Sequence, residues 1–125
     1  MILLTAHEII ELHKKIIAAT GGSHGLRDAG LLDSAVFGCY QAYAGKELYP
    51  SIIEKAARLA YALSKNHPFV DGNKRVGVMV MLITLDLNGI VLSYTQQELV
   101  TLGLEIASSN ISYEKIVTWI NVRKK

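Results

Sequence analysis

Apolar residues recur along the chain at the three- and four-residue spacing of amphipathic helices, and polar turns separate the stretches that carry this pattern. Three stretches open with a hydroxyl residue and a Glu three positions later, which is the capping box that begins many helices. These pairs span Thr5–Glu8, Ser51–Glu54 and Thr95–Glu98. Asp28 and Ser112 precede two further stretches, and their side chains suit the same N-terminal position. The pattern therefore predicts helices that begin near these five positions.

The helix that Asp28 begins is expected to reach as far as Tyr43. Its apolar residues include Leu32, Ala35, Val36, Cys39 and Tyr43. The role of Arg27, just before this helix, stays open. The connector at residues 45–50, from a Gly to a Pro, has room for a short hairpin or flap.

Residues 76–85 are almost purely apolar, so the helix predicted for residues 74–87 has no clear polar face. A helix that is hydrophobic all round is buried, and we expect other helices to cover this one on all sides. It ends at Asn88-Gly89 and is too short for a membrane span, which needs about 20 apolar residues. The predicted fold is all-α: one domain, residues 1–125, formed by a bundle of about six helices around this central helix.

The composition narrows the class of protein. The chain has 125 residues, of which 50% are hydrophobic, and a formal net charge of +2. This apolar content argues against disorder, and the small charge without a basic stripe argues against direct binding of nucleic acid. Cys39 is the only cysteine, so no internal disulfide forms, which agrees with a reducing compartment. We therefore expect a single cytoplasmic domain that needs neither nucleic acid nor a membrane.

A loop rich in reactive side chains precedes the central helix, with the sequence HPFVDGNKR over residues 67–75. An imidazole titrates near neutral pH, so His67 is a candidate general base. The free N–H groups of the following helix favour an anion such as phosphate. Phe69 is expected to plug the loop into the core. The other histidines, His7, His13 and His24, are interpreted as structural residues.

The rest of the loop has a functional and a structural interpretation. A lone carboxylate beside phosphate groups suits Mg²⁺, but Asp71 is also a suitable N-cap for the following helix. Gly72 permits a positive φ or the close approach of an anion. Asn73 either donates to a phosphate or pins the loop internally. Lys74 and Arg75 oppose the macrodipole of a helix N-terminus unless an anion is present, which favours phosphate binding over a solvated first turn.

Residues 67–75 resemble the signature of the Fic/Doc superfamily, HPFx(D/E)GN(G/K)R, and residues 25–35 (GLRDAGLLDSA) are similar to an early segment of Doc-type proteins. Two positions favour the Doc (death-on-curing) branch over adenylylating Fic enzymes. Lys74 stands where those enzymes usually have Gly, and Val78 stands where they carry a second Arg. Gly72 stands where some Doc proteins have Ala, which keeps adenylylation open as the alternative.

The resemblance implies a toxin of a toxin–antitoxin module that transfers the terminal phosphate of ATP to a Ser or Thr hydroxyl of a protein, with elongation factor Tu as the target class. His67 would be the general base, and Asp71 would hold Mg²⁺. The phosphates would be bound by Gly72, Asn73, Lys74 and Arg75. An antitoxin is expected to dock as a helix in an apolar groove. The alternatives are a Fic-type protein adenylyltransferase and a non-catalytic binding module.

Overall fold

The computed structural model describes residues 1–108 and 110–125, and this part of the chain contains six helices and one two-stranded antiparallel hairpin. The elements are, in chain order, α1 (Ala6–Thr20), α2 (Ala29–Gly38), β1 (Ala42–Tyr43), β2 (Lys46–Glu47), α3 (Ile52–Asn66), α4 (Asn73–Leu87), α5 (Gln96–Ala107) and α6 (Tyr113–Arg123). No helix among them has the length and apolar content needed to cross a bilayer. The expected all-α architecture is confirmed.

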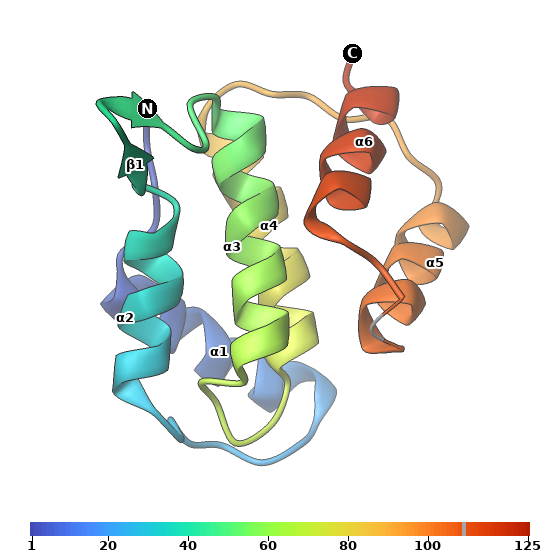
Figure 1. The fold of residues 1–125 in the computed structure, drawn as a ribbon. Helices are drawn as coiled ribbons and strands as arrows, with labels where there is room; N and C mark the ends of the chain where they lie inside the picture. The colour runs from blue at the N-terminus through green and yellow to red at the C-terminus, as the bar shows by residue number, and fades with distance from the viewer. Residues whose placement is uncertain (109) are drawn as a thin grey trace.

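Helices α3 and α4 lie side by side at the centre, with α1 and α2 on one side and α5 and α6 on the other (Figure 1). Helix α3 contacts α2, α4 and α6, while α4 contacts α1 and α5. The buried apolar side chains form two clusters, one on the side of α1 and α2 and one on the side of α5 and α6. Both halves of the core therefore depend on how closely α3 and α4 approach.

The three predicted capping boxes are all present. The Thr5 hydroxyl accepts a hydrogen bond from the Glu8 N–H at 3.2 Å, and the Glu8 carboxylate accepts from the Thr5 N–H at 2.9 Å. The same reciprocal pairs form in Ser51–Glu54 and Thr95–Glu98, and Asp28 begins α2. A side-chain cap stabilises its helix by about 1 kcal/mol. Local sequence therefore fixes where these helices start.

Helix α2 is shorter than the sequence predicted, because it ends at Gly38. The assignment of Tyr43 to its apolar stripe is wrong, since Tyr43 lies in β1 and is 79% exposed. The buried Lys55 ammonium of α3 donates to the Cys39 carbonyl at 3.1 Å and pairs with Glu47 of the hairpin at 3.0 Å. These bonds fold the connector over the start of α3 in place of another helical turn.

The hairpin stands at the N-terminal end of α3, whereas the loop of residues 67–72 leaves the C-terminal end (Figure 1). Helix α3 has 15 residues, so about 22 Å separate its two ends. A short hairpin is present, as expected, but it begins at Ala42, before the predicted connector of residues 45–50, and it is not a flap over the loop.

Helix α4 is not covered on all sides, and that expectation is wrong. Val76, Val80 and Met81 are fully buried, but Met79 is 40% exposed, and the neighbouring Val78 is only half-buried. The cause is the position of α5, of which only Leu102 and Ile106 are buried. Helix α5 therefore leaves a groove along this face of α4.

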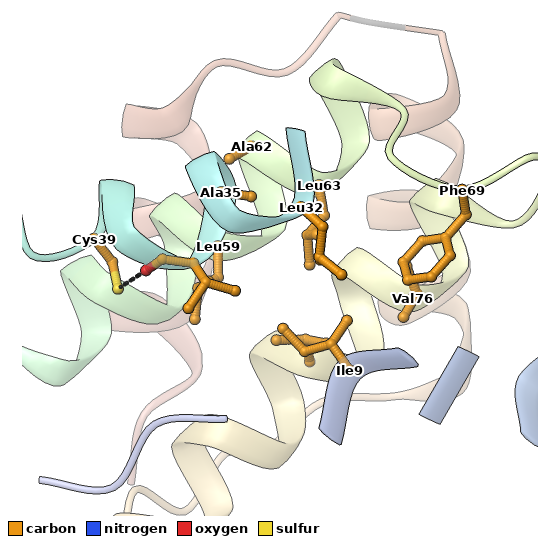
Figure 2. Packing of buried hydrophobic residues seen from close by; sticks show 11 residues of the cluster. Ile9, Leu32, Ala35, Cys39, Leu59, Ala62, Leu63, Phe69 and Val76 are labelled. Carbon is orange, nitrogen blue, oxygen red and sulfur yellow. Dashed lines mark hydrogen bonds between the residues drawn. The ribbon is translucent and has the colours of Figure 1, made fainter. Parts of the chain in front are cut away.

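Phe69 anchors the loop between α3 and α4 in the core, as predicted. Its ring is 1% exposed and belongs to the same cluster as Ile9 of α1 and Val76 of α4 (Figure 2). Full burial of a Phe side chain contributes about 1.5–3 kcal/mol. The shape of the loop is therefore tied to the packing of α1 on α4.

Gly77 of α4 sets the distance to α3. A Cβ at this position would lie 2.9 Å from the Ser64 Oγ and 3.0 Å from the Ala60 carbonyl oxygen. We therefore expect Gly77→Ala to lower the free energy of unfolding by about 1–3 kcal/mol through overpacking, measured by urea denaturation.

The matched control for this substitution is Gly103→Ala on α5. A Cβ there would meet no atom within 4 Å in the described residues outside its own helix. Because Ala favours a helix interior over Gly by about 0.5–1 kcal/mol, this variant should be as stable as the parent or more so. Equal destabilisation by both substitutions would contradict close packing at Gly77.

Candidate functional site

The loop of residues 67–72 begins and ends with a residue in the left-handed conformation. His67 ends α3 with a φ of 50°, and Gly72 precedes α4 with a φ of 76°. Gly adopts this conformation freely, whereas another residue pays about 1–2 kcal/mol. Contacts elsewhere in the structure must therefore hold His67 in place.

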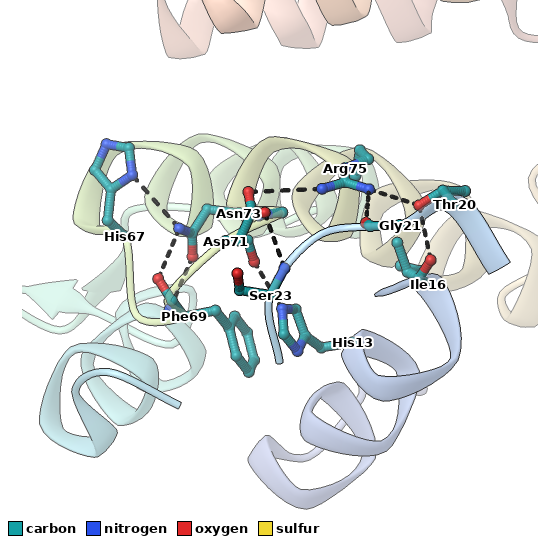
Figure 3. Close-up of polar contacts among 11 residues, drawn as sticks. His13, Ile16, Thr20, Gly21, Ser23, His67, Phe69, Asp71, Asn73 and Arg75 are labelled. Atoms are coloured by element: carbon teal, nitrogen blue, oxygen red, sulfur yellow. Dashed lines mark hydrogen bonds and ion pairs between the residues drawn. The ribbon is translucent and has the colours of Figure 1, made fainter. Parts of the chain in front are cut away.

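The side chain of Asn73 closes the loop (Figure 3). Its Oδ1 accepts from the Phe69 N–H at 2.9 Å, and its Nδ2 donates to the Phe69 carbonyl at 3.0 Å. The same Nδ2 lies 3.5 Å from Nδ1 of His67. Of the two interpretations of Asn73, these bonds support the one in which it pins the loop. A phosphate contact of this side chain stays a prediction.

The imidazole of His67 lies at the wall of the groove beside α4. Burial lowers the pKa of His67 from its ordinary value of 6.5, and the positive charges of Lys74 and Arg27 lower it further. At pH 7 the ring is therefore neutral and keeps one unprotonated nitrogen. That nitrogen is the acceptor that a general base needs.

The carboxylate of Asp71 faces the segment that follows α1. Its Oδ2 accepts from the Ser23 N–H at 3.1 Å and its Oδ1 from the Gly72 N–H at 2.8 Å, while Nη2 of Arg75 lies 3.6 Å from Oδ1. The hydrogen bond from the Ser23 N–H lowers the pKa of Asp71 most, and the one from the Gly72 N–H lowers it further, so this carboxylate is ionised at neutral pH. Its alternative role as N-cap of α4 is wrong, because Gly72 occupies that position and no side chain caps it.

The two cations that open α4 have different surroundings. Arg75 donates from Nη1 to the Thr20 hydroxyl at 2.6 Å and to the Gly21 carbonyl at 2.8 Å, which ties the end of α1 to the loop (Figure 3). Lys74 is half-buried and lines the groove, and it makes no side-chain hydrogen bond or ion pair within the described residues. The charge of Lys74 is therefore available to a ligand.

His13 of α1 supports the loop from the side of the core. Its ring stacks on Phe69 with centroids 3.9 Å apart, and its Nε2 lies 2.7 Å from the carbonyl oxygen of Asp71. Because a carbonyl only accepts, Nε2 carries the proton. The one signal in the sequence was the position of His13 on the apolar stripe between Ile9 and Ile17, where a buried polar group needs a partner.

Two more supporting residues come from the segment between α1 and α2. A Cβ at Gly22, whose φ is +115°, would lie 2.6 Å from Oδ2 of Asp71, so the backbone can approach this carboxylate only without a side chain. Arg27 donates from Nε to the His67 carbonyl at 2.7 Å and from Nη2 to the Asn66 carbonyl at 3.0 Å. Arg27 and His67 are 40 positions apart, so no local spacing revealed this contact.

A groove of about 840 Å³ opens at the loop and runs along the exposed face of α4 between α1 and α5. Its polar end is lined by His67, Asp71, Lys74 and Arg75. Its apolar remainder is lined by side chains of three helices, among them Ile16 of α1, Met79 of α4 and Leu104 of α5. The site thus combines a reactive end with a long apolar channel.

Known proteins are similar to this chain in sequence. The profile of the Fic/DOC family matches residues 3–85. Over 75 residues the chain is 41% identical to a protein named Toxin Doc from Mycolicibacterium smegmatis, and this alignment covers 60% of the chain and 58% of that protein. Over 113 residues it is 30% identical to Protein kinase doc from Escherichia phage P1, covering 90% of the chain and 88% of that protein.

The family profile covers the whole loop and each residue described above as its support, from His13 to Arg75. The chain spans less than two thirds of the length of the first relative and most of the second. The chain belongs to the Fic/DOC family, and within that family it is of the Doc type.

Proposed function

We propose that this chain is a Doc-like toxin that transfers the terminal phosphate of ATP to a Ser or Thr hydroxyl of a protein, with elongation factor Tu as the target. One observation carries the proposal: a neutral imidazole (His67), an ionised carboxylate (Asp71) and an available cation (Lys74) meet at one end of a single groove. The relative named Protein kinase doc supports phosphate transfer. A target in translation would place the toxin in the cytoplasm, where its action would arrest growth.

Each group at the polar end has a part in this chemistry. His67 would take the proton from the attacking hydroxyl. The start of α4 has no side-chain cap, so its free N–H groups near Gly72 can bind phosphate oxygens, with added charge from Lys74 and Arg75. Phosphoryl transfer is catalysed mainly by positioning and electrostatic stabilisation, so one base and several fixed donors are enough.

Asp71 fits a Mg²⁺ ion that is bound together with phosphate oxygens. Its carboxylate is ionised, and its side chain is 46% exposed at the groove. Within residues 1–108 and 110–125, no group of three or more His, Cys, Asp or Glu side chains comes together. The ion would therefore take its other ligands from the nucleotide and water, as Mg²⁺ often does, and would neutralise phosphate charge there.

Transfer of AMP, as in Fic-type adenylyltransferases, is the alternative activity, and Gly72 in the loop is the feature that favours it. Val78 lines the groove at the position where such enzymes carry a second Arg, so Arg75 is the single guanidinium that α4 offers. This arrangement favours the kinase. A non-catalytic binding module is the third candidate.

A label-transfer assay separates the three candidates. Purified protein, Mg²⁺ and elongation factor Tu are incubated with ATP labelled at either the γ or the α phosphate. We expect the target to acquire label from the γ position alone. Label from the α position would establish adenylylation instead. A non-catalytic module would transfer no label from either position, and saturable binding of ATP·Mg²⁺ at the loop would argue against it.

Two substitutions and their matched controls test the assigned residues in the same assay. We expect His67→Gln to lower the transfer rate by about 100-fold or more, because removal of a general base commonly costs about 10²–10⁴-fold. Asp71→Asn should raise the Mg²⁺ concentration needed for half-maximal rate. The controls His24→Gln and Asp33→Asn change exposed side chains outside the groove and should leave the rate unaltered.

The pH dependence follows from the lowered pKa of His67. The neutral base form is lost as the pH falls through this pKa, so the acid limb of kcat/KM should have its midpoint below 6.5. Lys74→Gln removes one of the charges that lower the pKa and should move the midpoint upward. A midpoint at or above 6.5 in the parent protein would contradict the assignment of His67 as the base.

We also propose that the apolar part of the groove receives a helix of the antitoxin. Toxins of such modules are restrained by a partner, and the exposed apolar side chains of Val100 and Leu104 on α5 extend the groove. An amphipathic helix places its apolar face in a channel of this kind. Because the channel ends at His67, a helix docked there would also block access to the base.

Growth rescue tests this docking site. Cells that express the toxin are transformed with a library of genomic fragments from its source, and the fragment that restores growth identifies the antitoxin. We expect Leu104→Asp to abolish rescue, because a charge in the channel opposes docking of an apolar face. Val122→Asp alters an exposed apolar residue of α6 outside the groove and should still be rescued. Rescue of both variants would exclude this site.

A further inference from the structure

The backbone at His67 needs an external support. Helix α3 ends at Asn66, and the last carbonyl groups of a helix have no partner within it. His67 then turns into the left-handed region with a φ of 50°, a conformation that is unfavourable for a residue with a side chain. The direction of the imidazole depends on this turn.

Arg27 supplies that support from a distant part of the chain. Its guanidinium spans the two carbonyls at the turn, with Nε 2.7 Å from the His67 oxygen and Nη2 3.0 Å from the Asn66 oxygen. Its planar fork places two donors in fixed directions, which a single ammonium does not do. The contact therefore restrains the two peptide groups that flank the Cα of His67.

The backbone around Arg27 is itself fixed to the loop. The N–H groups of Arg27 and Asp28 both donate to the Pro68 carbonyl, at 2.7 and 2.9 Å, and the Val70 N–H donates to the Gly25 carbonyl at 3.0 Å. Because these bonds use only main-chain atoms, they survive substitution of the Arg27 side chain. A variant at this position therefore probes the guanidinium alone.

We propose that Arg27 is a positioning residue for His67, whose guanidinium holds the left-handed turn at the end of α3 and so fixes the direction of the imidazole in the groove. This inference rests on the proposed function of His67 as the base and adds a residue outside the loop. Arg27 also acts through its charge. The charged groups that act on the imidazole are Lys74 and Arg27, and both lower the pKa of His67.

The test compares Arg27→Gln and Arg27→Lys in the full chain, with Lys46→Gln in the hairpin as a control that also removes one exposed charge. The pKa of the His67 ring is measured by NMR titration. The His67 signal is assigned as the one that is missing from the spectrum of His67→Gln. The transfer rate and the KM for ATP are measured on the same preparations. The Cα and Cβ shifts of His67 report whether its backbone keeps the left-handed conformation.

We expect Arg27→Gln to raise the pKa of His67 and to lower kcat by about 10-fold or more, since small misplacement of a reacting group is costly. The KM for ATP should stay within about two-fold, because the groove is unaltered. Arg27→Lys keeps the charge, so the pKa should stay near that of the parent while kcat still falls. Lys46→Gln should change neither.

Two results would overturn the inference: parental kcat in both Arg27 variants, or an unchanged pKa and unchanged backbone shifts of His67 in Arg27→Gln. If Arg27→Gln does not fold, Arg27→Lys decides, because it preserves charge and size and changes only the fork. Absence of phosphate transfer in the parent protein would reject the proposed kinase function. The NMR measurements would still decide whether Arg27 positions His67.

Discussion

The burial of Phe69 is the constraint on which the rest of the site depends. Its ring is held by the core on one side and stacks on His13 at 3.9 Å, so the backbone of the loop passes at a fixed depth. Both main-chain groups of Phe69 are then bound by the amide of Asn73, whose position is set by the first turn of α4. Core packing is thereby transmitted to His67 and Asp71 through a few short bonds.

Directional hydrogen bonds, more than ion pairing, maintain the shape of the loop. The ion pair of Arg75 with Asp71 is partly exposed at 3.6 Å, and solvent screens such a pair so that it contributes little. The directional bonds of Ser23 and Gly72 to Asp71, and of Arg75 to Thr20, impose the geometry instead. Lys74 makes none of these bonds in the described part of the chain, so its charge can meet an anion without disturbing the contacts that shape the loop.

The local sequence was sufficient to predict features that depend on contacts between residues close together in the chain. Capping boxes predicted helix starts, and the loop itself revealed Phe69 and the two alternatives for Asn73. The errors arose where a distant residue decides. Lys55 binds the segment after Gly38, whose first part, up to Tyr43, was assigned to α2. The placement of α5 leaves Met79 exposed although residues 76–85 of its helix are almost purely apolar. His13 and Arg27 join the site only through folding, since 58 and 40 positions separate them from Asp71 and His67.

The polar end and the apolar end of the groove are formed by different regions of the chain. Among the described residues, the side chains that hydrogen-bond to the loop come from the stretch between His13 and Arg75, whereas α5 lines the far end of the groove with apolar residues. Substitutions on α5 can therefore accumulate at little risk to the reactive end. With a partner helix docked in the apolar part of the groove, as proposed above, changes on α5 would alter which partner is bound while the residues of the polar end stay the same.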